Sequence, residues 1–252
     1  MWKTVGVSVK GTGHIRAGLP CQDAHQVSVL PGERLVAAVG DGAGSASRSE
    51  EGAMLAVSAA HIWLNSLPKN LSEMSEEKLR ETLTAPLNHA LGALERQAEA
   101  EELPLREFAT TLLIAFATPD YVAAAQIGDG AIVLRDANGD LHALTTPQNG
   151  EHANETTFLV SAGALETAQV YLWRGEVTHL ALFTDGLQHL ALKLPEAIPH
   201  APFFTPLLQF VSKADEIGEV EAQSQLENFL RSPRITDRTD DDLTLVLASL
   251  TR

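Results

Sequence analysis

The chain has 252 residues, of which 44% are hydrophobic and 20% charged, a composition that excludes an intrinsically disordered or collagen-like protein. Its 33 acidic and 18 basic residues give a formal net charge of −15, and a surface with this excess repels phosphate backbones and anionic lipid. Nucleic acid and membranes are therefore not expected as partners. Because no segment has the composition of a linker, we expect one domain over residues 1–252.

The cysteine content and the N-terminus bear on the compartment. Cys21 is the single cysteine, which excludes an internal disulfide and suits a reducing environment. The first nine residues alternate in character and contain no secretory core, and no stretch approaches the roughly 20 apolar residues of a membrane span. We expect a soluble, cytoplasmic protein.

The first half of the chain predicts strands followed by two helices. Residues 5–9 alternate as a half-buried strand does, and residues 27–30 and 35–39 form two strands separated by a hairpin-like break at Pro31-Gly32.

Helix signals come next. Ser47 and Glu50 form a capping box, which predicts a helix from there to about Leu67. A second helix is predicted to start near Ser75, with a kink or restart at Pro86, because proline lacks the N–H that the helix needs.

The second half of the chain is richer in strands. Consecutive antiparallel strands are predicted at residues 110–116, 121–127, 131–135 and 141–144, with further strands at 170–173, 179–183 and 243–250 and a helical region over about 206–230. Strands and helices do not alternate one by one, which disfavours a parallel doubly wound sheet. We therefore predict an α+β layered sandwich.

Three apolar runs each end in an Asp-Gly pair, namely Asp41-Gly42, Asp129-Gly130 and Asp185-Gly186, and the run Asp240-Asp241-Asp242 leads directly into the last strand. Strands with carboxylates at their ends are suited to bind a hard divalent cation, and glycine lets the backbone turn and its carbonyl approach the ion. Without cations, carboxylates gathered in this way would repel one another until at least one was protonated.

A second interpretation is open for each pair, because Asp-Gly after a strand is also a common hairpin signal. It is strongest for Asp129-Gly130, since another apolar run begins at Ala131. It is weaker for Asp41, which small residues and a helix follow, and for Asp185, which leads into a helical pattern. The aspartates at 240–242 could also form a solvated charged segment, although three adjacent acids that enter a core strand cost electrostatic energy.

Taken in order, five motifs resemble the metal-dependent protein phosphatase 2C family. They are Gln22-Asp23-Ala24, Gly40-Asp41-Gly42, Gly128-Asp129-Gly130, Thr184-Asp185-Gly186 and Asp241-Asp242-Leu243-Thr244. Gly11-Thr12-Gly13-His14 and Pro20-Cys21-Gln22-Asp23-Ala24 are similar to the start of a bacterial branch of that family. Each motif alone is weak, whereas all five in the same order form a strong signal.

The resemblance implies a four-layer α-β-β-α sandwich with two central antiparallel sheets and a site for two Mg²⁺ or Mn²⁺ ions at one end. Asp41 would contact both ions, the Gly42 carbonyl would contact one, and Asp185 and Asp241 would complete the second ion's shell. Asp23 matches an acid that acts through metal-bound water. In addition, Asp129 matches the ligand of a third, weaker ion.

This resemblance also implies an activity. Two ions about 3.5–4 Å apart can convert a bridging water into hydroxide for in-line attack and neutralise the phosphoryl oxygens. The implied protein is a monomeric serine/threonine phosphatase, with Asp23, Asp41, Asp185 and Asp241 as catalytic residues. Its implied partners are a phosphorylated protein and a serine/threonine kinase or that kinase's target.

Three positions depart from the family pattern. Ala43 stands where many relatives have a histidine that protonates the leaving group, and Gly18 replaces a phosphate-binding arginine. Arg16 or His14 could bind the phosphate instead, or either could have a surface or packing role. His189 replaces an aspartate that helps to bind the third ion, which leaves that third site open.

Two other functions stay open at this point. Ala43 and Gly18 would fit a catalytically idle, phosphatase-like binding module, although the retained aspartates argue against it. A small phosphorylated metabolite could be hydrolysed at the same site. The turn-rich segment 146–155 could contact substrate beside the site or form an ordinary surface loop.

Overall fold

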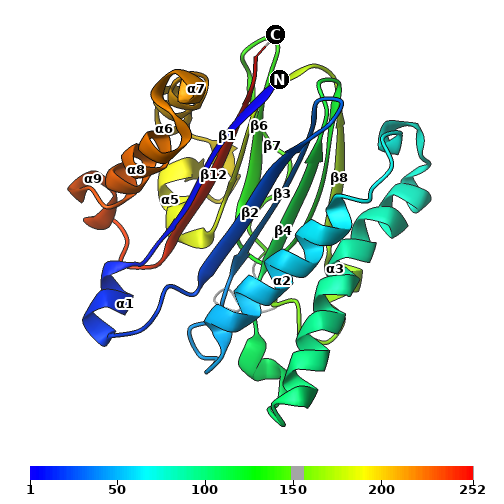
Figure 1. Ribbon diagram of the computed structural model, residues 1–252, viewed down its shortest axis with the longest axis vertical. Helices are drawn as coiled ribbons and strands as arrows, with labels where there is room; N and C mark the ends of the chain where they lie inside the picture. Colours follow the sequence, from blue (N-terminus) through cyan, green and yellow to red (C-terminus); the bar gives the residue numbers. More distant parts are fainter. Residues whose placement is uncertain (149–155, 252) are drawn as a thin grey trace.

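The computed structural model describes residues 1–148 and 156–251. The chain forms two five-stranded antiparallel sheets that pack face to face, with helices on the outer side of each (Figure 1). The first sheet has the strand order β1-β12-β9-β6-β7 and the second has the order β2-β3-β4-β5-β8. The predicted four-layer α-β-β-α sandwich is therefore confirmed.

The strands have the following bounds. The first sheet contains β1 (Trp2–Val9), β12 (Leu243–Leu250), β9 (Val177–Phe183), β6 (Ala131–Asp136) and β7 (Leu141–Ala143). The second contains β2 (Asp23–Leu30), β3 (Arg34–Asp41), β4 (Leu112–Ala117), β5 (Tyr121–Ile127) and β8 (Gln169–Arg174). The short strands β10 (Leu192–Lys193) and β11 (Ile198–Pro199) pair with each other.

Burial on both faces explains why the central strands are apolar at successive positions rather than at alternate ones. In β3, Val36 and Ala38 belong to the hydrophobic cluster under the helices, whereas Ala37 and Val39 belong to the cluster between the sheets. Successive side chains of a strand point to opposite faces, so a strand between two buried layers needs hydrophobic residues on both. The hydrophobic residues at successive positions of the central strands therefore reflect the four-layer arrangement.

Helices cover the outer faces of both sheets. On the second sheet lie α2 (Ser49–Leu64) and α3 (Glu76–Ala100). On the first lie α5 (Gln188–Ala191), α6 (Ala201–Val211), α7 (Ala214–Ile217), α8 (Glu219–Leu230) and α9 (Pro233–Thr236). The remaining short helices are α1 (Thr12–Ala17), α4 (Ala164–Thr167), η1 (Leu71–Glu73), η2 (Leu105–Phe108) and η3 (Asp185–Leu187).

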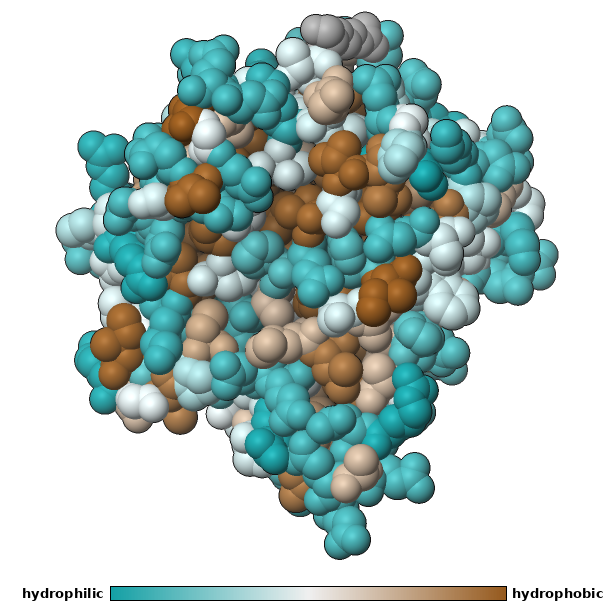
Figure 2. Space-filling model, in the orientation of Figure 1, coloured by the Kyte–Doolittle hydropathy of each residue, from teal (hydrophilic) through white to brown (hydrophobic). Residues whose placement is uncertain are grey.

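The surface is mainly hydrophilic on the face that Figure 1 presents, and hydrophobic side chains form patches among the polar ones (Figure 2). Within the described part of the chain, no helix combines the length and the apolar character that crossing a membrane requires.

The first predicted helix is present as α2, but the capping box predicted for it is wrong. The N-cap of α2 is Arg48, without a side-chain capping bond, and the Ser47 amide donates to the Glu107 carboxylate (3.0 Å). The second helix starts as predicted, with the Ser75 side chain accepting a bond from the Lys78 amide, and it continues through Pro86 as one element, so the helix does not restart there. The third helical region begins at Ala201, earlier than predicted.

The hairpin interpretation of Asp129-Gly130 is also wrong. β5 pairs with β4 and β8 in the second sheet, whereas β6 pairs with β9 and β7 in the first. The segment between β5 and β6 therefore crosses from one sheet to the other. In contrast, the hairpin predicted at Pro31-Gly32 is confirmed, because β2 and β3 pair along their whole length.

Candidate metal centre

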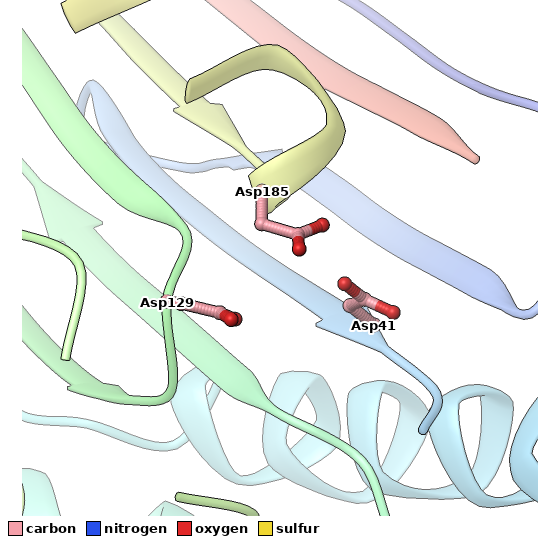
Figure 3. Close-up of side chains that lie close together, drawn as sticks. All are labelled: Asp41, Asp129 and Asp185. Atoms are coloured by element: carbon pink, nitrogen blue, oxygen red, sulfur yellow. The ribbon is translucent and has the colours of Figure 1, made fainter. Parts of the chain in front are cut away.

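Three carboxylates meet where the two sheets come together at one end of the sandwich. Asp41 ends β3, Asp129 lies in the crossing between β5 and β6, and Asp185 begins η3, two residues after the end of β9. One oxygen of each lies within 4.8 Å of the corresponding oxygens of the other two. Figure 3 shows the three side chains pointing toward one another. Of the predicted site residues, these three form the centre of the cluster.

Asp41 and Asp23 are placed by strand pairing. They lie opposite each other in the register of β2 and β3. The backbone of Asp41 is fixed on its other side, because its N–H donates to Thr111 Oγ1 (3.0 Å) and its carbonyl accepts from the Thr111 N–H (2.8 Å). Asp23 Oδ2 accepts a hydrogen bond from Thr184 Oγ1 (2.8 Å), which ties it to the end of β9 in the other sheet.

The glycines after the three aspartates act through close packing. A Cβ atom would lie 2.5 Å from the Ser49 carbonyl oxygen at Gly42, 2.5 Å from that of Phe183 at Gly130, and 2.2 Å from that of Asp242 at Gly186. None of the three has a positive φ. These glycines therefore do not need the left-handed backbone conformation, and what the structure shows at each is room for close approach of another backbone segment.

Gln126 is a residue of the site that the sequence interpretation missed. Its side chain is fully buried, and its Nε2 donates to the carbonyls of Gly128 (2.9 Å) and Gly130 (2.6 Å), on either side of Asp129. An amide inside an otherwise apolar strand was the available signal, because a buried polar group needs partners.

Burial and mutual repulsion shift the cluster toward protonation. The pKa values of Asp23 and Asp41 lie well above the ordinary range, mainly because both are buried and secondarily because other carboxylates are near. Burial and then the charge of Asp129 raise the pKa of Asp185 to about 6. Burial also raises the pKa of Asp129, whose Oδ2 accepts a bond from Thr156 Oγ1 (2.5 Å).

These residues fit a divalent cation. Asp23 Oδ1 and Asp185 Oδ1 are buried and have no hydrogen-bond partner among the described residues. Buried carboxylate oxygens without donors are costly, and hard cations such as Mg²⁺ and Mn²⁺ take oxygen ligands. A cation would therefore supply both the missing partner and the missing positive charge.

Asp241 lies outside the group of three but close to it. Its charge raises the pKa values of Asp129 and Asp185. One of its oxygens, Oδ1, accepts a bond from the Asp242 N–H (2.8 Å). Gly42, the other predicted ligand, is held by a bond from its N–H to the Gln22 carbonyl (3.0 Å).

The two predicted phosphate-binding residues both pair with acids of the 240–242 run. His14 Nδ1 lies 2.8 Å from Asp242 Oδ2, and Arg16 donates to Asp240 Oδ2 at 2.8 Å. Asp242, which was not predicted as a site residue, also accepts bonds from the backbone N–H groups of Gly11 (2.7 Å) and Gln22 (2.6 Å).

Cys21 beside the cluster is not suited to nucleophilic chemistry. Burial, followed by the charges of Asp23 and Asp242, raises the pKa of its thiol to about 12. Because the thiolate is the nucleophilic form, a thiol with this pKa is nearly inert at neutral pH.

Part of the turn-rich segment 146–155 falls at residues 149–155, outside the described residues. Thr146, at the described start of this segment, and Thr156, just after it, line a cavity of about 650 Å³ together with Asp129 and His189. The position considered for a third ion thus opens into a cavity.

Comparison with known proteins identifies the family. The model of the protein phosphatase 2C family matches residues 10–231. The chain belongs to this family. Serine/threonine-protein phosphatase 3 of Escherichia coli (strain K12) is 38% identical over 251 residues, which cover 98% of each chain.

Solved structures of bacterial serine/threonine phosphatases have the same fold. The serine/threonine phosphatase Stp1 from Staphylococcus aureus matches with a TM-score of 0.67 and 13% identity, over 100% of this chain and 96% of that one. The S. agalactiae serine/threonine phosphatase matches with a TM-score of 0.67 and 12% identity, over 100% of both chains. The predicted family and fold are confirmed.

Proposed function

We propose that this protein is a metal-dependent serine/threonine phosphatase that removes phosphate from a phosphorylated protein. The observation that carries the proposal is the convergence of Asp41, Asp129 and Asp185 from both sheets within a protein phosphatase 2C domain. The 38% identity to a serine/threonine-protein phosphatase over nearly the whole chain supports the same substrate class.

The proposed metal is Mg²⁺ or Mn²⁺, held as two ions by Asp41, Asp185, Asp241 and the Gly42 carbonyl, with Asp129 serving a third, weaker site. When bound, such ions activate water and neutralise charge on the transferred phosphoryl group. Asp23 Oδ1, which has no partner among the described residues, is the proposed acceptor for a proton of the attacking water. The other oxygen of this carboxylate, Oδ2, accepts a hydrogen bond from Thr184, which holds the side chain in position.

Of the two proposed phosphate-binding residues, we favour Arg16. In its ion pair with Asp240, both side chains are exposed to solvent, and an exposed pair contributes little to stability. The guanidinium can therefore release Asp240 and bind a phosphate instead. His14 is bonded to the buried Asp242, which favours a positioning role for its ring.

We also propose a partner, a compartment and an oligomeric state for the enzyme. Its substrate must be supplied by a serine/threonine kinase, and we propose that this kinase or its target is the partner. The single reduced cysteine supports action in the cytoplasm, and we propose a monomer.

Phosphate release from phosphoserine and phosphothreonine peptides tests the proposal. We expect release with Mn²⁺ or Mg²⁺, none after chelation with EDTA, and a loss of at least about a hundredfold in Asp41→Asn, because each ion contributes several kcal/mol of charge stabilisation. Asp120→Asn, at an exposed carboxylate in the turn after β4, is the matched control and should keep full activity.

Other outcomes would favour other functions. Full activity in the chelated enzyme would contradict the proposal. Release from small phosphorylated metabolites but from no peptide would assign the same site to a phosphomonoesterase. Binding of a phosphoprotein without any release, in protein shown to hold Mn²⁺, would identify a catalytically idle binding module.

A further inference from the structure

A groove of about 680 Å³ lies beside the metal centre, between the segment 19–22 and the first half of α2. It shares Gln22 with the centre, since the carbonyl of this residue accepts the Gly42 N–H. Its lining includes the loop 44–48, which follows Asp41-Gly42 after one residue. A polypeptide whose phosphorylated side chain enters the centre would therefore have neighbouring residues within reach of this groove.

The walls of the groove are partly apolar. Met54 on α2 is 59% exposed and Leu19 is 40% exposed, although both are large hydrophobic residues. Their side chains offer apolar contact to a ligand at the edge of a polar site, which is typical of binding grooves.

The charge of the groove is negative. Arg48 pairs with Glu51 (3.5 Å) and with Glu101, so two carboxylates already surround its guanidinium. Glu50 lines the same groove and has no cationic partner among the described residues. The groove lining thus contains two carboxylates, those of Glu50 and Glu51, and one guanidinium, that of Arg48, which leaves a net negative charge on the groove wall.

Gln22 adds an unused hydrogen-bond acceptor at the junction of groove and centre. Its side chain is only 6% exposed, and Oε1 has no partner within the described residues. A buried carbonyl oxygen without a donor is costly, and this one belongs to a residue that both lines the groove and bonds to Gly42 of the centre.

We propose that this groove binds the substrate polypeptide next to its phosphorylated residue and that Glu50 selects a basic side chain there. The inference rests on the proposed phosphatase function. An arginine or lysine fits both features of the groove, because its aliphatic stem covers Met54 and Leu19 while its charged end reaches Glu50. An acidic side chain at the same place meets like charge and is disfavoured.

Matched phosphoserine peptides test the groove. Each series carries arginine, alanine or glutamate at one position, and the position is moved along both sides of the phosphoserine. We measure kcat/KM with Mn²⁺, and fluorescence anisotropy gives the Kd of each labelled peptide. At one or more positions, wild type should prefer arginine over glutamate by about tenfold, and Glu50→Lys should remove or invert that ratio.

Glu216→Lys is the matched control, since it makes the same charge change at an exposed glutamate on α7, in the opposite helical layer. It should leave the arginine-to-glutamate ratio unchanged. Because each ratio compares peptides within one variant, partial unfolding of a variant does not alter it. An effect of equal size in Glu216→Lys would show that net charge alone is responsible and would overturn the proposal.

The two proposals fail in different ways. If no peptide loses phosphate, the phosphatase function is wrong, and the Kd ratios in wild type and Glu50→Lys still decide whether the groove selects basic peptides. If peptides are hydrolysed but arginine gives no advantage at any position, or keeps its full advantage in Glu50→Lys, the groove does not have the proposed role.

Discussion

The carboxylate of Asp242 joins three segments that meet at the rim of the metal centre. Its two oxygens accept bonds from the backbone of Gly11, from the backbone of Gln22 and from the ring of His14. The side chain is only 3% exposed, so water does not compete for these donors. Asp242 therefore sets how α1 and the start of β2 lie against the start of β12.

Replacement of Asp242 by alanine should lower the free energy of unfolding by about 3 kcal/mol, because two buried N–H groups lose their acceptor. Urea unfolding measures this loss. Asp240→Ala is the control in the same run, since the Asp240 carboxyl is 71% exposed and pairs with the exposed Arg16. It should cost less than about 1 kcal/mol. Equal losses in the two variants would contradict the role given to Asp242.

Asp185 makes the stability of the metal-free protein depend on pH. Its pKa is about 6 in the folded protein, compared with an ordinary value of 3.8 that the unfolded chain should have. Between pH 3.8 and pH 6 the folded protein therefore binds a proton that the unfolded chain does not. A raised carboxyl pKa gives stability that is present at low pH and is lost as the pH rises through about 6.

Asp185→Asn removes this titration. With EDTA present, the variant should gain stability relative to wild type by about 2–3 kcal/mol between pH 4 and pH 7, as followed by urea unfolding. Saturating Mn²⁺ should stabilise wild type more at pH 7 than at pH 5, because protons compete with the ion for the carboxylates. A difference between variant and wild type that is the same at both pH values would contradict this account.

The end of β9 and the start of β12 lie too close together for a Cβ atom at Gly186. At Gly186, between β9 and α5, a Cβ atom would lie 2.2 Å from the carbonyl oxygen of Asp242, at the start of β12. Backbone on both sides cannot give way as a flexible side chain can. The glycine therefore sets the spacing between the segments that carry Asp185 and Asp241.

Gly186→Ala should push these segments apart, with a loss of about 3 kcal/mol in stability and weaker Mn²⁺ binding. Gly44→Ala is the matched control, because the added Cβ would meet only Gln22 Oε1, at 3.9 Å. Thermal unfolding and calorimetric titration with Mn²⁺ measure both effects. If Gly186→Ala bound Mn²⁺ as tightly as Gly44→Ala, close approach at this glycine would not matter for the site.

Local sequence signals predicted elements well where neighbours in sequence decide the structure. The hairpin at Pro31-Gly32 and the start of the second helix near Ser75 are of this kind. The signal at Asp129-Gly130 failed because the choice between a hairpin and a crossing depends on which distant strands cover β5 and β6. Ser47 failed as a cap for a similar reason, since Glu107, which is far away in sequence, takes its amide.

At the scale of the whole molecule, the candidate centre depends on how the two sheets are stacked. The order of the aspartate motifs indicated that the acids would gather, and Asp41, Asp129 and Asp185 do so. Gln126 and Asp242 escaped prediction because their importance comes from bonds across the fold that no spacing in the sequence records. The groove beside α2 likewise exists only once the segment 19–22 lies along the helix.

A cation in the centre would connect the two sheets, because Asp41 comes from the second sheet and Asp185 from the first. A ligand at a hundred times its Kd adds about 2.7 kcal/mol to the free energy of unfolding. For a chain of this size, that corresponds to a rise in Tm of roughly 5–10 °C with saturating Mn²⁺. Asp41→Asn should abolish the rise, whereas Asp120→Asn should retain it in full. An equal rise in Tm in both variants would mean that Mn²⁺ binds at another place in the protein. It would contradict the assignment of Asp41 and Asp185 as metal ligands.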